Sequence, residues 1–461
     1  MAAKARSVFR CTECGAEQPK WSGRCDACQA WNALVEEAPA RPRARRGAAG
    51  GGARGGPGPG PEPVRLDGIA ADRAPRHRTG LAEFDYVLGG GIVPGSLVLV
   101  GGEPGIGKST LLLQVAARLE AAGVPTLYAS GEESPEQVRL RADRLTEPAG
   151  AVHVLAETAI ERVIEHAERL GARAVVVDSI QTAYTAELEG APGNVGQVRE
   201  CAARLMRFAK EEGPAVLLVG HVTKGGGIAG PKTLEHIVDT VLYFEGESTL
   251  DHRILRATKN RFGGVDEIGV FEMTAAGLLP VANPSAAFLA ARHEGLSGSA
   301  VTALMEGTRP VLVEIQALAA RAGFGTPQRV SAGVDHRRLA VLLAVLERRA
   351  GLPFGDLDVF VNVVGGMRLS EPSSDLAVVA ALISSVRDRA LPAEALFVGE
   401  VGLGGEVRAV PGVERRLAEA AHHGFRRAFV GTRTGGRQAL PPGFELVRVE
   451  DLGDLAHRLA A

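Results

Sequence analysis

The chain lacks any long apolar run. None of its hydrophobic segments approaches the ~18 residues that a membrane-spanning helix requires, and its first residues, MAAKARSVFRCTEC, contain no apolar core typical of a signal peptide. A strong charge of either sign is also missing, because the formal net charge is −2 over 461 residues. We therefore expect a cytoplasmic protein without a membrane partner, in which any nucleic-acid binding depends on local basic patches.

Cysteine is scarce as well, and four of the five cysteines lie within the first 28 residues. They form two Cys-x-x-Cys pairs separated by ten residues: Cys11, Cys14, Cys25 and Cys28. Four thiolates in two paired turns suit a closed tetrahedral Zn²⁺ site, which would be structural because no ligand position stays open. A pair of redox dithiols is the alternative. We expect Trp21 and Trp31 to pack against this module, with stacking on nucleic-acid bases as the alternative.

The chain is longer than one hydrophobic core normally serves, so two or three domains are expected. Residues 41–63, RPRARRGAAGGGARGGPGPGPEP, are rich in Gly, Pro and Arg and are predicted to be a flexible basic linker. The predicted organisation is a four-cysteine zinc finger over 1–33, a linker over 34–63, a first α/β domain over 64–284 and a second α/β domain over 285–461.

Short apolar runs alternate with helical patterns between residues 64 and 280. Runs such as LVLVG (97–101), RAVVVD (173–178) and AVLLVG (215–220) are predicted to be buried strands of a parallel sheet, with helices from Lys108 and around 196–212. Cys201 falls on one helical stripe with Val198, Leu205 and Phe208, so it is predicted to be a plain core residue. A second alternation follows residue 285, with helices predicted over 334–349, from residue 375 and from about residue 413.

A phosphate-binding motif follows the first of these strands directly. GEPGIGKST fits the pattern G-x-x-x-x-G-K-[ST] between a strand and a helix, which is the context that the motif requires. Its glycines let backbone N–H groups wrap phosphate oxygens, Lys108 should reach the β- and γ-phosphates, and Ser109 should bind Mg²⁺. The motif predicts ATP or GTP binding by Gly102, Glu103, Pro104, Gly105, Ile106, Gly107, Lys108, Ser109 and Thr110.

Two acidic positions complete the predicted catalytic set. Asp178 ends an apolar strand, which is where a second ligand on the Mg²⁺ side of a nucleotide site is expected. A strand-terminal Asp can also be a helix cap. Glu132 and Glu133 follow the strand after the phosphate-loop helix, and one of them could orient and deprotonate the attacking water. We choose Glu132 as the base, with an ordinary acidic turn as the alternative.

Two basic segments are candidates for nucleic-acid contact. His221 ends a strand next to the predicted nucleotide, where it could sense the γ-phosphate, and the glycine-rich loop after it carries Lys224 and Lys232. Lys259 and Arg261 form the second cluster, in the sequence TKNRFG. A solvated loop and a charged hairpin edge are the respective alternatives.

These motifs together resemble the RadA (Sms) family of bacterial DNA-repair proteins. The segments that carry the resemblance are CTECG…CDAC, TGLAEFDYVLGGGIVPGSLVLVGGEPGIGKST, YASGEES, VVVDSIQT and KNRFG, and it covers the chain apart from the linker. The resemblance implies a RecA-like ATPase core that uses ATP and forms a ring hexamer on single-stranded and branched DNA. It further implies a branch-migration motor in homologous recombination, acting with the RecA recombinase.

In that family the KNRFG motif is tied to DNA binding and ATP turnover, which gives Lys259 and Arg261 a DNA-binding and catalytic role. A basic side chain that reaches a neighbouring subunit's nucleotide would explain why the motif requires a ring. The cross-subunit role is a hypothesis.

The C-terminal domain of the family is similar to the proteolytic domain of Lon, in which G-P-S-A-G carries the nucleophilic serine and a lysine in G-G-L-K-E-K is its base. Ser373 takes the serine position here and Arg416 the lysine position. A guanidinium with a pKa above about 12 cannot accept a proton at working pH. Glu371 and Asp375 also replace the flanking glycines, which puts negative charge where an oxyanion hole needs donors. We expect Ser373 to be a helix N-terminal residue in a proteolytically inactive scaffold.

Two other classes of function compete with the DNA motor. An ATP-dependent protease is disfavoured by the missing lysine base at Arg416. A signalling ATPase of the same superfamily is disfavoured by the zinc module and by KNRFG.

Overall fold

The computed structural model describes residues 8–11, 16–27, 29, 31, 34–37, 65, 67, 75–221, 234–246, 252–265, 267–323, 326–433 and 441–460. The N-terminal residues form a small antiparallel sheet in the order β2-β1-β3, with β1 Val8–Cys11, β2 Glu17–Gln18 and β3 Leu34–Glu37. Because β3 pairs with β1, the N-terminal module extends beyond the boundary predicted at residue 33. The predicted linker from residue 41 to 63 lies outside the described residues.

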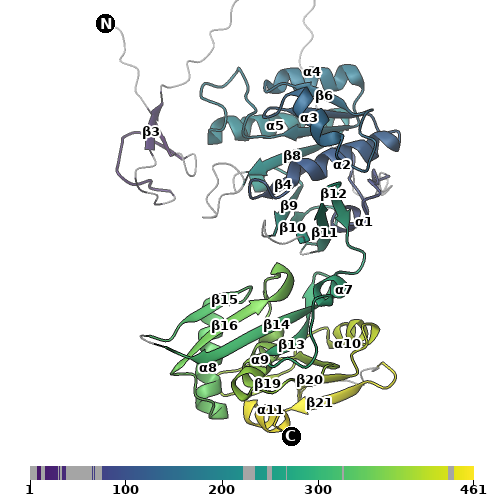
Figure 1. Ribbon diagram of the computed structural model, residues 1–461. Helices are drawn as coiled ribbons and strands as arrows, with labels where there is room; N and C mark the ends of the chain where they lie inside the picture. The colour runs from purple at the N-terminus through teal and green to yellow at the C-terminus, as the bar shows by residue number, and fades with distance from the viewer. Residues whose placement is uncertain are drawn as a thin grey trace, which may run out of the picture.

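The first α/β domain is built on a nine-stranded sheet with the order β12-β11-β10-β9-β4-β8-β7-β5-β6 (Figure 1). β4 lies between β8 and β9 and runs parallel to both, and β7, β5 and β6 continue the parallel arrangement. The strands are β4 Leu97–Gly102, β5 Thr126–Ser130, β6 His153–Ala156, β7 Ala174–Asp178, β8 Ala215–His221, β9 Thr240–Glu245, β10 His252–Asn260, β11 Ile268–Thr274 and β12 Gly277–Pro280. The carboxyl ends of β4, β5, β7 and β8 therefore meet at one edge of the sheet.

Helices cover both faces of this sheet, which explains why its central strands are apolar throughout. The helices are α1 Ala82–Val87, α2 Lys108–Ala121, α3 Pro135–Ala142, α4 Ile160–Leu170 and α5 Val195–Glu212. Residues of α2 share one core cluster with the strands, and residues of α4 and α5 share another on the opposite face. Cys201 is fully buried in the second cluster together with Val198, Leu205 and Phe208, so its prediction as a core residue is confirmed. None of the helices in the described part of the chain could cross a membrane.

The prediction of a parallel sheet is incomplete, because β10, β11 and β12 are antiparallel to their neighbours. Parallel neighbours need a crossover of about a dozen residues or more. The connections that follow β9, β10 and β11 are shorter than that. These strands therefore form an antiparallel meander on the edge of the parallel core.

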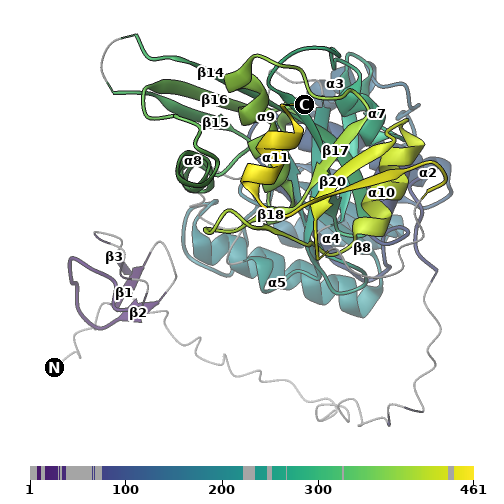
Figure 2. The same cartoon turned by 90° about the horizontal axis from the view of Figure 1, so that it is seen from below.

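The second α/β domain contains a seven-stranded mixed sheet with the order β15-β16-β14-β13-β17-β20-β21. In Figure 2, β14, β15 and β16 project together from the rest of the domain. Helices α8, α9 and α11 pack into one core cluster and α10 into another. The strands are β13 Ser299–Glu306, β14 Arg309–Arg321, β15 Arg329–Ala332, β16 Leu357–Val363, β17 Ala395–Val398, β18 Glu400–Val401, β19 Val407–Arg408, β20 Arg427–Gly431 and β21 Glu445–Val449. The helices are α7 Pro284–Leu289, α8 His336–Ala350, α9 Asp375–Arg387, α10 Val413–His422 and α11 Leu452–Arg458, with short 3₁₀ turns η2 Val364–Gly366 and η3 Pro372–Ser374.

The turn between β13 and β14 joins the two domains. Arg309 donates to both carboxylate oxygens of the buried Glu83 in α1, at 3.1 and 2.9 Å. The backbone N–H of Thr308 and the hydroxyl of Tyr86 donate to the two oxygens of Glu267, at 3.2 and 2.8 Å. Arg256 of β10 pairs with Glu306 at the end of β13. The domain contact therefore combines several charge-assisted hydrogen bonds around one tight turn with apolar packing, since Ile254, Ile268 and Val270 share the core cluster of the second domain.

The serine at the Lon-like nucleophile position is buried in the second domain. Ser373 lies in η3, immediately before α9. Its Oγ accepts a hydrogen bond from Nη1 of Arg416 at 3.1 Å. A guanidinium cannot accept the proton of the serine, so Arg416 cannot serve as the base that the lysine supplies in Lon.

Arg416 is fully buried, and its charge is balanced by Glu371. The guanidinium donates to both carboxylate oxygens of Glu371, at 2.6 and 2.7 Å, and also to the backbone carbonyls of Pro411 and Ala303. Glu371 also accepts the backbone N–H of Met305 at 2.8 Å. Burial alone would raise the pKa of Glu371, but the bonds from Arg416 outweigh it and hold that pKa below its ordinary value. The pair at the Lon-like positions is therefore a structural clamp between α10, η3 and β13.

Removing the charge of Arg416 should destabilise the second domain. Arg416→Met keeps a long side chain but leaves the Glu371 carboxylate without its partner, which should cost about 3 kcal/mol. The matched variant Ser373→Ala removes only one hydroxyl group from the same site and should cost about 1 kcal/mol or less. Chemical denaturation followed by circular dichroism measures both. Equal stabilities of Arg416→Met and the wild type would contradict the clamp.

The stabilising contribution of Glu371 should depend on pH. Because its folded-state pKa lies below the ordinary value of 4.5, its contribution is complete above pH 4.5 and is lost as the pH falls through the lower folded-state pKa. Glu371→Gln cannot titrate, so the stability difference between wild type and variant should be constant between pH 6 and 8 and should shrink below pH 4.5. Thermal unfolding across this range is the measurement. A difference that stays constant down to pH 3 would argue against an ionised Glu371 in the folded chain.

Candidate nucleotide-binding site

The phosphate loop connects the carboxyl end of β4 to the first residue of α2. Lys108 is buried, and its Nζ donates to the backbone carbonyls of Gly102 and Glu103, at 2.9 and 2.8 Å. Burial lowers the pKa of Lys108 to about 8, against the attraction of Asp178 and Glu132, which raises it. The ammonium group is therefore held by two carbonyls that phosphate oxygens can replace.

Glycine is required at two positions of this loop. Gly107 has a φ of +114°, and a Cβ there would lie 2.6 Å from the Cε of Met273. A Cβ on Gly102 would lie 2.7 Å from the backbone oxygen of Phe244. Side chains at these positions would push the loop off the sheet and close the space in which backbone N–H groups meet phosphate.

Asp178 ends β7 and is buried, with 6% of its surface exposed. The neighbouring strand β5 supplies Tyr128, whose hydroxyl donates to Oδ2 of Asp178 at 2.5 Å. The peptide bond between Asp178 and Ser179 is cis. Asp178 and Lys108 are close enough for the carboxylate to raise the pKa of the lysine, so the structure brings these two predicted residues together.

Glu132 lies at the carboxyl end of β5 and contacts two further strand ends. Its Oε1 accepts a hydrogen bond from the Oγ of Ser179 at 2.5 Å and lies 3.1 Å from the Nε2 of His221. Burial would raise the pKa of Glu132, but the bonds from Ser179 and His221 outweigh it and lower that pKa. Glu132 is therefore ionised at neutral pH and can accept a proton.

Glu133, the other candidate for the base, is committed elsewhere. Its Oε1 pairs with the Nη2 of Arg141 in α3 at 2.5 Å, and its backbone N–H donates to Ser130. The two adjacent carboxylates thus have different partners: Glu133 pairs with Arg141, and Glu132 contacts Ser179 and His221.

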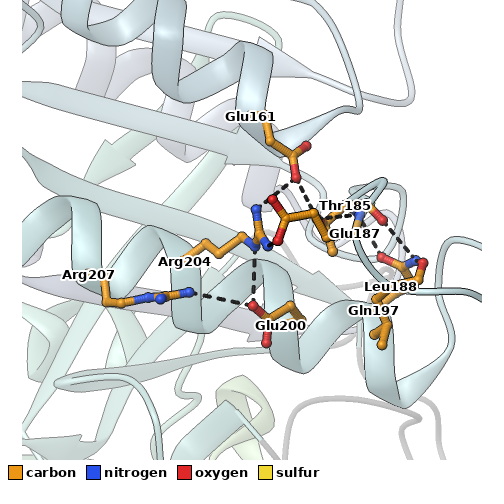
Figure 3. A network of polar contacts seen from close by, with 8 residues as sticks. All are labelled: Glu161, Thr185, Glu187, Leu188, Gln197, Glu200, Arg204 and Arg207. Atoms are coloured by element: carbon orange, nitrogen blue, oxygen red, sulfur yellow. Dashed lines mark hydrogen bonds and ion pairs between the residues drawn. The ribbon is translucent and has the colours of Figure 1, made fainter. Parts of the chain in front are cut away.

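The segment that follows Ser179 is anchored by a dense polar network (Figure 3). Arg204 of α5 pairs with Glu161 at 2.9 Å, Glu187 at 2.5 Å and Glu200 at 3.2 Å. The buried Gln197 accepts the backbone N–H of Thr185 at 2.8 Å and donates to the backbone carbonyls of residues 185, 188 and 190. These bonds hold the path from β7 to α5 against the sheet and so support the position of Ser179 beside Glu132.

The donor set fits a magnesium nucleotide. The hydroxyl of Ser109 follows Lys108 at the start of α2, and the carboxylate of Asp178 lies close to that lysine. Hydroxyl and carboxylate oxygens are the hard ligands that Mg²⁺ prefers. The remaining residues of the predicted loop, from Gly102 to Thr110, link β4 and α2 without a break.

Lys259 and Arg261 lie at the other edge of the same sheet. Asn260 ends β10 opposite Thr240, and Thr240 pairs with Val98 near the start of β4, whereas the phosphate loop begins at Gly102. The rise along a strand puts about 13 Å between these two levels of the sheet. Within one chain, the structure does not bring this predicted pair together with Lys108, Asp178 and Glu132.

Both basic residues are anchored to the turn that precedes β9. Lys259 donates to the backbone carbonyls of Glu235 and Val238, at 2.5 and 2.8 Å. Its pKa is lowered, mainly by burial and to a smaller extent by repulsion from Arg261. Arg261 reaches the buried Asp239 at 3.3 Å while 53% of its side chain remains exposed. The Arg261 guanidinium is therefore paired with Asp239 through Nη1 and is half-exposed to solvent. Lys224 and Lys232 lie outside the described residues.

The N-terminal module brings two of the predicted metal ligands together. Cys11 and Cys25 are both buried in one small cluster. A backbone bond from Cys11 to Ala16 closes the first turn, and one from Gln29 to Cys25 closes the second. Two thiols presented by two turns fit a metal with sulfur ligands. Cys14 and Cys28 lie outside the described residues.

The prediction that the two tryptophans pack against this module is wrong. Trp21 is 58% exposed and Trp31 is 71% exposed. Arg24 lies over the ring of Trp31, 5.6 Å from its centroid. The buried cluster among the described residues of the module, Cys11, Cys25 and Leu34, is too small to cover such large rings.

Sequence reasoning missed Tyr128, Ser179 and Arg141, which hydrogen-bond to the carboxylates of Asp178, Glu132 and Glu133 respectively. Tyr128 stands two residues before Ser130, which pairs with Asp178 across the sheet. Only the pairing of β5 with β7 makes the two side chains neighbours, and no spacing in the sequence contains that information.

Two family models match the chain, an AAA domain over residues 71–227 and a rubredoxin metal binding domain over residues 9–36. Among solved structures, a KaiC-like protein from Pyrococcus horikoshii matches with a TM-score of 0.38 and 20% identity, covering 45% of this chain and 99% of that one. The RadB recombinase matches with a TM-score of 0.36 and 24% identity, covering 44% and 99%. These scores are too low to support an argument beyond the family models.

Full-length relatives carry the assignment. The DNA repair protein RadA of Pseudomonas aeruginosa is 52% identical over 453 residues, which cover 98% of each chain. The proteins of the same name from Bacillus subtilis and Escherichia coli are each 49% identical, again over 98% of both chains. Identity at this level along the whole length, together with a phosphate-loop site and a metal-binding module, means that this chain belongs to the family of the DNA repair protein RadA.

Proposed function

We propose that this chain is a DNA-dependent ATPase that drives branch migration of recombination intermediates during DNA repair, as a ring hexamer acting with the RecA recombinase. The observation that carries the proposal is the division of the functional residues between two edges of one sheet. Lys108, Asp178 and Glu132 meet at the carboxyl edge, and Lys259 and Arg261 lie at the amino edge.

The residues at the carboxyl edge fit ATP hydrolysis. Lys108 would exchange its two backbone carbonyls for phosphate oxygens, and the ionised Glu132 would accept the proton of the attacking water. Ser109 and Asp178 would hold Mg²⁺, which supplies neutralisation of phosphate charge when bound. His221 contacts Glu132 from the end of β8, so a change at the γ-phosphate would be transmitted to the loop that follows β8.

The residues at the amino edge support assembly into a ring. Arg261 is too distant from its own chain's phosphate loop to assist there, yet its guanidinium is half-exposed and is held by Asp239 through Nη1 alone. In a ring in which the amino edge of one subunit's sheet faces the carboxyl edge of the next, Arg261 would approach the neighbouring nucleotide. There it would stabilise the charge that develops on phosphate. Hydrolysis would then require the assembled ring.

DNA contact would come from local basic groups, because the net charge of the chain is close to zero. Lys259 and Arg261 are candidates within the described residues, and Lys224 and Lys232 on the loop after His221 are candidates outside them. The loop connects directly to the strand that contacts Glu132, which would couple DNA contact to hydrolysis.

The N-terminal module would hold structural Zn²⁺ through Cys11, Cys14, Cys25 and Cys28. We place this activity in the cytoplasm, where the chromosome lies.

A protease function is not supported, because Arg416 donates to Ser373 and is itself neutralised by Glu371. A signalling ATPase would share the phosphate-loop site. The N-terminal metal-binding module and the KNRFG cluster argue against that class.

ATP hydrolysis should respond to single-stranded DNA. Purified full-length chain should hydrolyse ATP several-fold faster with single-stranded DNA than without it, and Lys108→Ala should remove both rates because the phosphate contact is lost. Steady-state phosphate release is the measurement. Hydrolysis that ignores DNA would refute the DNA-coupled motor and favour the signalling class.

Two inactive variants should complement each other if the site is completed by a neighbouring subunit. Lys108→Ala keeps Arg261, and Arg261→Ala keeps the phosphate loop, so mixed rings contain interfaces with both groups. An equal mixture should recover about a quarter of the wild-type rate if each interface acts independently and assembles at random. Arg261→Lys mixed with Lys108→Ala is the conservative comparison. No recovery in mixtures that demonstrably exchange subunits would rule out the cross-subunit role.

A further inference from the structure

Tyr128 is completely buried, yet its hydroxyl reaches the functional edge of the sheet. It lies on β5, two residues before Ser130, and Ser130 pairs with Asp178 on β7. Residues two apart on a strand face the same side, and diagonal neighbours across a sheet are within reach of an aromatic side chain. The hydroxyl of Tyr128 accordingly donates to Oδ2 of Asp178 at 2.5 Å.

This hydroxyl is a donor. An ionised carboxylate can only accept hydrogen bonds, so the phenol is the donor in this contact. Among the described residues, Tyr128 is the hydrogen-bond donor to the Asp178 carboxylate. Phenylalanine would fill the same space in the core, so packing alone does not explain a tyrosine here.

A nearby cation, Lys108, could draw the Asp178 carboxylate away from Tyr128. The Lys108 ammonium is close enough for Asp178 and Glu132 to raise its pKa. A carboxylate released from Tyr128 could turn toward this cation and pair with it. Both groups would then be withdrawn from the nucleotide. The bond from Tyr128 opposes this collapse by holding one oxygen of Asp178 on the side of β5.

We propose that Tyr128 is a positioning residue for Mg²⁺: by donating to Oδ2 it fixes the orientation of the Asp178 carboxylate that faces the metal. The inference rests on the proposed nucleotide site and adds a residue to it. Groups that orient a metal-binding side chain affect the metal affinity by about 10- to 100-fold when they are removed. Tyr128 therefore contributes to metal affinity without touching metal or phosphate.

The test compares Tyr128→Phe with Tyr243→Phe in the full chain. Tyr243 is a matched control, because it is also a strand tyrosine whose hydroxyl donates to a carboxylate, that of Glu235 at 3.0 Å. Binding of a fluorescent, non-hydrolysable ATP analogue is titrated with Mg²⁺, and is also measured in EDTA. Tyr128→Phe should need about 10-fold more Mg²⁺ for half-maximal binding, whereas Tyr243→Phe should match the wild type. Neither variant should change binding in EDTA.

Three results would overturn the proposal: an unchanged Mg²⁺ midpoint in Tyr128→Phe, an equal loss of binding with and without Mg²⁺, or an equal shift in Tyr243→Phe. A double-mutant cycle with Asp178→Asn provides a second test. If Tyr128 acts through Asp178, adding Tyr128→Phe to Asp178→Asn should shift the midpoint less than about twofold further, and a full additional shift would refute it. A wild-type chain whose binding ignores Mg²⁺ would instead count against the proposed nucleotide site itself.

Discussion

The position of β4 between β8 and β9 is the constraint on which the functional arrangement depends. Because these strands run parallel, and β7 and β5 continue the same direction, every loop after a strand emerges at one edge. The phosphate loop, Glu132, Asp178 and His221 come from four separate parts of the sequence, and the direction of the strands alone brings them together. The same geometry sends Asp239 and the end of β10 to the opposite edge, so the KNRFG residues cannot serve the same site within one chain.

The buried cations of the two domains, Lys108 and Arg416, have different kinds of hydrogen-bond partners. Lys108 is held by two backbone carbonyls, which are neutral acceptors that it can leave when phosphate arrives. Arg416 is held by a carboxylate through two parallel bonds and by two carbonyls. Moving the buried guanidinium would be costly in free energy, because it would leave the Glu371 carboxylate without a partner. One site is prepared to exchange partners with a ligand, and the other is permanently closed.

The clamp around Arg416 also supports the contact between the domains. Glu371 accepts the N–H of Met305, and the next residue, Glu306, pairs with Arg256 on β10. β10 in turn continues to Lys259. A line of polar contacts thus runs from the Lon-like serine position of the second domain, through the end of β13 beside its turn to β14, to the strand that carries the KNRFG residues. This turn is short and anchored on both sides, so the two domains have little freedom to move independently at this point.

The sequence by itself determined those features that depend on local spacing. The phosphate loop, the buried strands before it and before Asp178, the core position of Cys201 and the inability of Arg416 to act as a base follow from residue type and order. Tertiary structure decided everything that depends on which strands are neighbours. The antiparallel meander of β10 to β12, the different partners of Glu132 and Glu133, and the bond from Tyr128 to Asp178 join residues that are distant in sequence. Strand order is set by the packing of whole faces against helices, and a short motif contains no record of that packing.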